Sequence, residues 1–152
     1  MLRLAIAVND PDKRFLPSLI SIFTRARAYH TELVFSDGNA IEIVGSHLGW
    51  VTRDYDRYKW VMLELPMVTD EEELAIRHEG QRLLDLHPKY DYVGAILGRF
   101  KRSLENPNKW YCSEFCRALL APYVEGLEND QKWITPDRLW RELAALLPVQ
   151  NN

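Results

Sequence analysis

The stretch YHTELVFSDGNAIEIV, residues 29–44, decides the fold that this chain is expected to adopt. Two runs rich in apolar and β-branched residues, 29–35 and 40–44, flank the polar segment Ser36-Asp37-Gly38-Asn39. An Asp-Gly pair between two such runs is a strong signal for a β-hairpin. The sequence therefore predicts that residues 29–44 form two antiparallel strands joined by a tight turn.

Further strands are expected on both sides of this hairpin. Leu4, Ile6 and Val8 alternate with smaller residues, which is typical of a half-buried strand. Residues 60–65 form another short apolar run, and Pro66 ends it. Together with the hairpin, these segments predict a small antiparallel sheet.

Helices are expected around the strands. Thr69 and Glu72 have the capping-box spacing at the start of a helix that runs to about His87. The segment Thr135-Pro136-Asp137 has the pattern of a second helix start. Other helical segments are expected at 16–23, 90–97 and 113–120. The fold class is therefore α+β, in a single domain over residues 1–152.

Composition narrows the class of function. The chain has 152 residues, 47% of them hydrophobic, and a net charge of −3, which argues against a general nucleic-acid binder. The first apolar run is too short for a signal peptide, and no run approaches the ~18 residues of a membrane helix, so no membrane anchor is expected. Two cysteines four residues apart make a poor disulfide framework, so a reducing cytoplasm is the expected location.

The segment WYCSEFCRALL, residues 110–120, raises the question of a nucleophile. A thiol at a helix start feels the positive end of the helix dipole, and an adjacent imidazolium favours the thiolate further. Cys112 has the first property if the helix begins at Ser113. Cys116 lies one turn deeper beside Phe115 and Leu119, which indicates a small core residue. For Cys112 itself, a nucleophile and a buried structural thiol both remain open.

A base for that thiol would have to be one of four histidines. His30 begins a strand, and a rigid strand holds a side chain better than a loop does. His47 is expected in a loop after the hairpin, His78 within a helix, and His87 near the end of that helix. The alternative for His30 is a strand-edge residue whose ring is satisfied by backbone groups.

A third member, which would orient the histidine, depends on the hairpin turn. Glu42 lies between Ile41 and Ile43, so its carboxylate must face solvent or find a partner. A two-residue turn would put Glu42 on the face opposite His30, whereas a three-residue loop with a G1 bulge reverses that parity. Glu32, which shares a face with His30 by strand alternation, is the rival.

The order His30, Glu42, Cys112 resembles that of the circularly permuted NlpC/P60 branch of papain-like cysteine hydrolases. YCSEFCRAL is similar to that superfamily's Cys-Ser-x-Phe helix start. HTELVFSDGNAIE resembles its hairpin, in which a polar residue follows the histidine after twelve positions, and this spacing favours Glu42 over Glu32. The segments FTRARAYHTELVF, KYDYVGAI and ITPDRLW also resemble parts of the family, so that the likeness spans roughly residues 3–143.

The resemblance implies a permuted papain-like fold with the nucleophile at the start of a packed helix. It implies acyl transfer through a thioester without a cofactor, with Cys112 as nucleophile, His30 as base and Glu42 as orienter. The substrate would be an amide or peptide, including a cell-wall peptide. Three aromatic residues near the site are candidates for substrate contact or, alternatively, for the core: Tyr29, Trp110 and Tyr111.

Three other readings remain open. The permuted branch includes lipid-directed relatives similar to lecithin:retinol acyltransferase, so the substrate could be an acylated small molecule acted on by a thioesterase or acyltransferase. A non-catalytic module could keep the fold as a binding cleft. Cys112, Cys116 and a histidine could instead bind zinc, although no metal is expected from this spacing.

Overall fold

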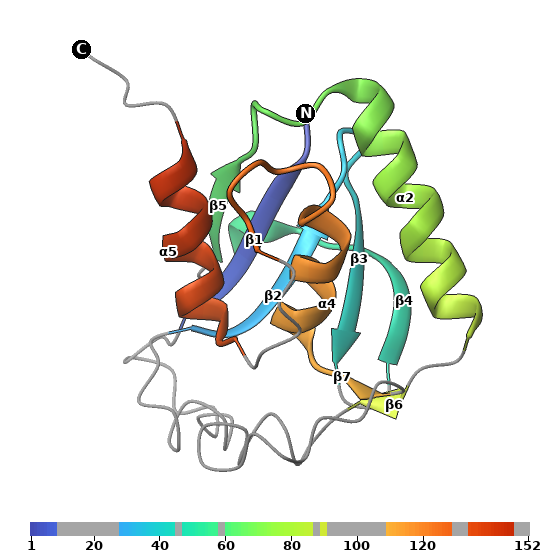
Figure 1. Ribbon diagram of the computed structural model, residues 1–152. Helices are drawn as coiled ribbons and strands as arrows, with labels where there is room; N and C mark the ends of the chain where they lie inside the picture. The colour runs from blue at the N-terminus through green and yellow to red at the C-terminus, as the bar shows by residue number, and fades with distance from the viewer. Residues whose placement is uncertain are drawn as a thin grey trace.

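The computed structural model describes residues 1–8, 28–44, 47–57, 60–86, 89–90, 109–128 and 134–147 (Figure 1). The elements within these ranges are, in chain order, β1 (Arg3–Val8), β2 (Ala28–Val34), β3 (Asn39–Val44), β4 (His47–Thr52), the 3-10 helix η1 (Tyr55–Arg57), β5 (Trp60–Glu64), α2 (Asp70–Asp85), β6 (Lys89–Tyr90), β7 (Lys109–Trp110), α4 (Cys112–Leu120) and α5 (Pro136–Leu146).

Five of the strands form one antiparallel sheet in the order β4-β3-β2-β1-β5. The short strands β6 and β7 pair in parallel as a separate two-stranded sheet. The five-stranded antiparallel sheet, together with the three α-helices of the described residues, confirms the α+β class that the sequence predicts.

Two local predictions were wrong. His47 lies in β4 and not in a loop. The prediction missed this strand because β4 is only half-buried and shows no clear alternation that would mark it as a strand. Tyr90 lies in β6, where it pairs with Trp110, and does not open a helix. The rest of that predicted helix, 91–97, lies outside the described residues, as does the predicted helix at 16–23.

The β2–β3 hairpin turns through a three-residue loop. The N–H of Phe35 donates to the carbonyl of Asn39 at 2.8 Å, and the N–H of Gly38 donates to the carbonyl of Phe35 at 3.0 Å. Gly38 has a φ of 84°, a left-handed conformation that glycine adopts without steric cost. The loop pairs Val34 with Ala40, which is the parity that places Glu42 on the same face of the sheet as His30.

The helix that begins with Cys112 is the centre of the packing. α4 packs against β2 and β3, and α2 and α5 lie on either side of it (Figure 1). Phe115 and Leu119 of α4 are fully buried against Ile41 and other strand residues. Gly80 lets α2 approach closely, since a Cβ atom there would lie 2.6 Å from the Ile41 Cδ1 atom. The start of α4 is thereby fixed against the sheet.

The helix starts follow the predicted caps. The Thr69 side chain accepts from the N–H of Glu72, and the Glu72 side chain accepts from the N–H of Thr69, which is the complete capping box. The Thr135 hydroxyl accepts from the N–H of Arg138 at the start of α5. None of the helices in the described ranges has the length and apolar character that crossing a membrane requires.

Candidate active site

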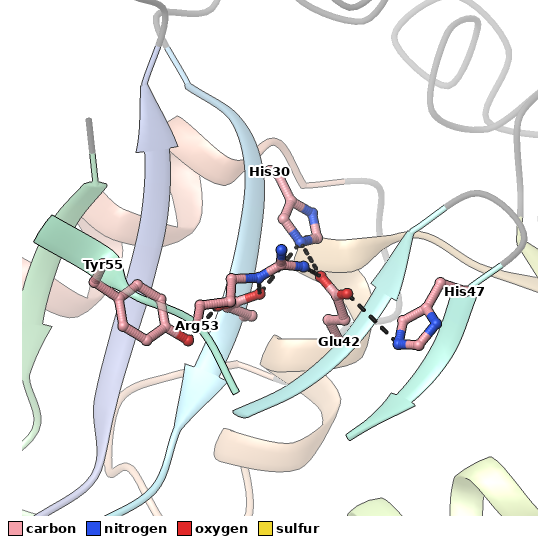
Figure 2. Close-up of polar contacts among 6 residues, drawn as sticks. His30, Glu42, His47, Arg53 and Tyr55 are labelled. Atoms are coloured by element: carbon pink, nitrogen blue, oxygen red, sulfur yellow. Dashed lines mark hydrogen bonds and ion pairs between the residues drawn. The ribbon is translucent and has the colours of Figure 1, made fainter. Parts of the chain in front are cut away.

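His30 and Glu42 meet between neighbouring strands. The Nε2 atom of His30, on β2, lies 2.9 Å from the Oε2 atom of Glu42, on β3 (Figure 2). Both side chains are nearly inaccessible to solvent, with exposed fractions of 9% for His30 and 2% for Glu42. The contact that the sequence predicts from the three-residue loop is therefore present.

Glu32 also lies beside the histidine, because residues two apart on β2 share a face of the sheet. Its Oε2 atom lies 3.6 Å from His30 Nε2, farther than the Glu42 oxygen, and the residue is fully buried. The hairpin turn places Glu42 within reach of the imidazole. The shorter distance to His30 Nε2 then shows that Glu42, and not Glu32, is its hydrogen-bond partner. Glu42 makes the hydrogen bond, and Glu32 stands as a second carboxylate behind it.

Cys112 is the first residue of α4, one position earlier than the sequence predicts. It is 2% exposed and lies close enough to His30 to raise the pKa of that imidazole. The backbone N–H of Cys112 lies in the first helical turn, where N–H groups have no partner within the helix. The structure thus brings all three predicted triad members together.

The start of α4 is held by a clamp on Ile134. The hydroxyl of Tyr111 accepts a hydrogen bond from the backbone N–H of Ile134, and the Ser113 hydroxyl donates to the Ile134 carbonyl at 2.6 Å. Tyr111 and Ser113 are buried, and they flank Cys112 on both sides. This clamp fixes the backbone that carries the thiol.

The three predicted substrate contacts fare differently. Tyr111 is occupied by packing and by its bond to Ile134, and burial raises the pKa of its hydroxyl. Trp110 is partly buried and meets the Phe115 ring edge-on, with 6.3 Å between the ring centroids. The side chain of Tyr29 lies outside the described part of the chain. A role in substrate binding stays a prediction for each of them.

Arg53 and Tyr55 are site residues that the sequence analysis missed. The Arg53 guanidinium donates from Nε to Glu32 Oε2 at 3.1 Å and from Nη2 to Glu42 Oε2 at 2.5 Å (Figure 2). The Tyr55 hydroxyl donates to Glu32 Oε1. One signal could have shown that a cation is needed here, without singling out Arg53: two carboxylates on one buried face require a cation nearby.

His47 lies at the solvent side of the site. Its Nε2 atom is 3.7 Å from Glu42 Oε1, and its side chain is 55% exposed. Figure 2 shows it on the far side of Glu42 from His30. Glu42 therefore faces His30 and Arg53 inside the protein and His47 toward water.

The charges around the imidazole favour its protonated form. Burial works against protonation of His30, but its interactions with Cys112, Glu32 and Glu42 outweigh the effect of burial and raise the pKa of His30 well above its ordinary value. Burial likewise opposes ionisation of Glu42, yet His30 and Arg53 lower the pKa of that carboxyl to about 2. These interactions therefore favour the imidazolium form of His30, next to Cys112.

Cys116, the other cysteine, lies in different surroundings from Cys112. Its exposed fraction is 1%, and it belongs to the apolar core beneath Cys112. Burial, together with the negative groups nearby, raises the pKa of the Cys116 thiol well above its ordinary value. Cys116 therefore stays a neutral thiol in the core, which is the structural role that the sequence predicts for it.

One group of potential metal ligands occurs within the described ranges, namely His30, Glu32 and Glu42, with ligand atoms within 4.8 Å of one another. The group includes neither cysteine, so it is not the zinc site that a Cys112–Cys116 pair would form. Arg53 already binds both carboxylates. The protein itself thus supplies the cation that these two buried carboxylates need.

The lowered pKa of Glu42 makes the stability of the protein depend on pH under acidic conditions. Because the pKa is lowered from 4.5 to about 2 in the folded protein, the unfolded chain binds more protons between these values. The stabilisation from Glu42 is present above the higher value and is lost as the pH falls toward the lower one.

We therefore expect Glu42→Gln to lower the free energy of unfolding by about 3 kcal/mol near neutral pH, and by roughly half as much near pH 3. Urea unfolding of both proteins at several pH values measures this difference. A difference that stays constant from neutral pH to pH 3 would contradict the ion pairing of Glu42.

Comparison of the chain with protein-family models, with curated proteins and with solved structures found no match. The residues and their geometry therefore carry the functional argument.

Proposed function

We propose that this protein is a cysteine hydrolase with a permuted papain-like fold, which cleaves an amide or peptide bond through a thioester. The observation that carries the proposal is the arrangement around His30. Its Nε2 atom is held by Glu42 at 2.9 Å, and Cys112, at the start of α4, lies close enough to raise the pKa of the imidazole. A nucleophile, a base and an orienting carboxylate in this order are the parts of a catalytic triad.

The reaction begins with attack of the Cys112 sulfur on the substrate carbonyl carbon. The carbonyl π electrons move to oxygen, and His30 holds the proton that the thiol has given up. When the tetrahedral intermediate collapses, the bond to the leaving nitrogen breaks and His30 delivers its proton to that nitrogen. An amine leaves, and the acyl group remains on Cys112 as a thioester.

Water completes the cycle. His30 takes a proton from the water as its oxygen attacks the thioester carbonyl, and the C–S bond then breaks. The carboxylic acid leaves, and the proton returns to the Cys112 sulfur. Glu42 keeps the imidazole oriented in both halves and stabilises the imidazolium that each half requires.

The first turn of α4 supplies an oxyanion donor. The N–H of Cys112 is one of the helix-start donors without an intrahelical partner, and it lies next to the attacking sulfur. A donor of this kind can contribute ~3 kcal/mol to the stability of the transition state. The clamp on Ile134 supports this role by fixing the backbone on both sides of the donor.

Trapping the acyl-enzyme tests the proposal. The protein is incubated with activated acyl donors of two kinds, aminoacyl and peptidyl p-nitroanilides and fatty-acyl p-nitrophenyl esters, and intact-mass spectrometry records any adduct. We expect an adduct from the amide series that maps to Cys112 and is released by hydroxylamine, as a thioester is. Adducts from the fatty-acyl series alone would favour a lipid-directed acyltransferase, and no adduct from either series would favour a binding module.

A further inference from the structure

Arg53 joins two buried carboxylates that belong to different strands. Its Nε atom binds Glu32 of β2 and its Nη2 atom binds Glu42 of β3, at 3.1 and 2.5 Å. Both glutamates are buried, with exposed fractions of 0% and 2%, whereas the arginine side chain is 32% exposed. Arg53 follows β4 in the chain and reaches back across the sheet to both of them (Figure 2).

The two carboxylates present a conflict that the arginine resolves. Both lie near the same nitrogen of His30, at 2.9 and 3.6 Å. A protonated His30 balances only one of the two charges, so without a second cation one of the buried carboxylates would take up a proton. Glu32 and Glu42 would then compete for the imidazole, and the shared proton would reside on one or the other.

The hydrogen bonds give each glutamate a separate set of partners. Glu32 is bound at one oxygen by the Tyr55 hydroxyl and at the other by Arg53. Glu42 is bound at one oxygen by both His30 and Arg53, and its other oxygen faces His47. Each oxygen of Glu32 thereby has a hydrogen-bond donor other than the histidine, while Glu42 keeps its hydrogen bond to the imidazole.

Trp60 supports this arrangement from β5. Its ring meets the His30 ring edge-on, with 6.0 Å between centroids, and the Tyr55 ring at 5.4 Å. The Arg53 guanidinium lies 5.9 Å from the centre of the same ring. One indole therefore contacts the imidazole and both of the groups that hold Glu32.

We propose that Arg53 is a positioning residue of the proposed triad, which bridges Glu32 and Glu42 so that Glu42 alone orients His30. This inference rests on the proposed function, because it assigns a role relative to the Cys112–His30 pair. Among the described residues, the titratable or charged groups that interact with the two carboxylates include His30, His47, Arg53, Tyr55 and Cys116.

The test compares four proteins in a Cys116→Ala background: the parent, Arg53→Met, Glu32→Gln and the double variant Arg53→Met/Glu32→Gln. The first readout is the pH profile of Cys112 alkylation. We expect Arg53→Met to slow alkylation at neutral pH by about tenfold and to add an ionisation between about pH 5 and 8, from the proton that the carboxylate pair then holds. The double variant removes the surplus carboxylate together with the cation, so it should regain a rate within about threefold of the parent and lose the added ionisation.

The second readout is the tautomer and titration of His30, followed by ¹⁵N NMR of the imidazole. This readout needs no reactive thiol, so it separates the two claims. An unreactive Cys112 in the parent would overturn the proposed function. A pH profile and a His30 titration in Arg53→Met that match those of the parent would overturn the role of Arg53, as would a double variant no better than Arg53→Met. A merely structural arginine would not be rescued by losing Glu32 as well.

Discussion

Cys112→Ser is expected to lose acyl-enzyme formation completely within detection, a drop of about 10³-fold or more. The serine hydroxyl is far less acidic than a thiol, so the neighbouring imidazole does not generate an effective nucleophile from it. The replacement is nearly the same size and leaves a small polar group near His30. The fold should therefore persist, with a melting temperature within about 4 °C of the parent.

Cys116→Ala is the matched control for this result. Cys116 is buried in the apolar core one helical turn away, and alanine fills most of its volume without adding a polar group. The variant should form the acyl-enzyme at the parental rate once its folding has been verified by circular dichroism. Equal losses in the two variants would contradict the division of roles between the cysteines.

Glu42→Gln is expected to slow acylation by about 10²-fold, at the lower end of what general acid–base catalysis contributes. The amide retains a hydrogen bond to the imidazole, but it does not stabilise the imidazolium as a carboxylate does. The effect should appear in the rate of acyl-enzyme formation, measured by stopping the reaction in acid and recording the mass of the adduct over time.

Glu32→Gln is the control for that prediction, because it is isosteric and lies at the same site. Its carboxylate is bound by Tyr55 and Arg53 and stands 3.6 Å from the histidine, so we expect a loss of less than about fivefold. A larger loss from Glu32→Gln than from Glu42→Gln would transfer the orienting role to Glu32.

The hairpin shows how far the sequence predicts this fold. The Asp37-Gly38 pair predicts a turn between two strands, and the two turn lengths that it permits lead to opposite positions for Glu42. The structure has the longer one, as the hydrogen bond from the N–H of Phe35 to the carbonyl of Asn39 shows, and Gly38 adopts the left-handed φ of 84° that either turn would accept. The sequence therefore predicts the contact between His30 and Glu42 only if the hairpin has the three-residue loop, and the turn residues alone do not decide the loop length.

Arg53 shows where prediction from the sequence stops. It lies just beyond β4, a strand that was missed because its residues are half-buried and lack regular alternation. Its partners are 11 and 21 residues away in sequence, and neither spacing carries a recognisable pattern. Only the burial of two carboxylates on one face indicates that a cation must be near, and that condition names no residue.

The pH dependence of Cys112 alkylation, measured with and without His30, tests the central claim most directly. The protein carries Cys116→Ala, and a small reagent such as iodoacetamide is used because the thiol is only 2% exposed. We predict that the alkylation rate is already near its maximum at neutral pH, whereas a free thiol ionises only near pH ~8.5. In His30→Ala the rate should no longer reach this maximum at neutral pH. Identical profiles in the two proteins, or a thiol that the reagent does not reach in the folded state, would contradict a nucleophile paired with His30.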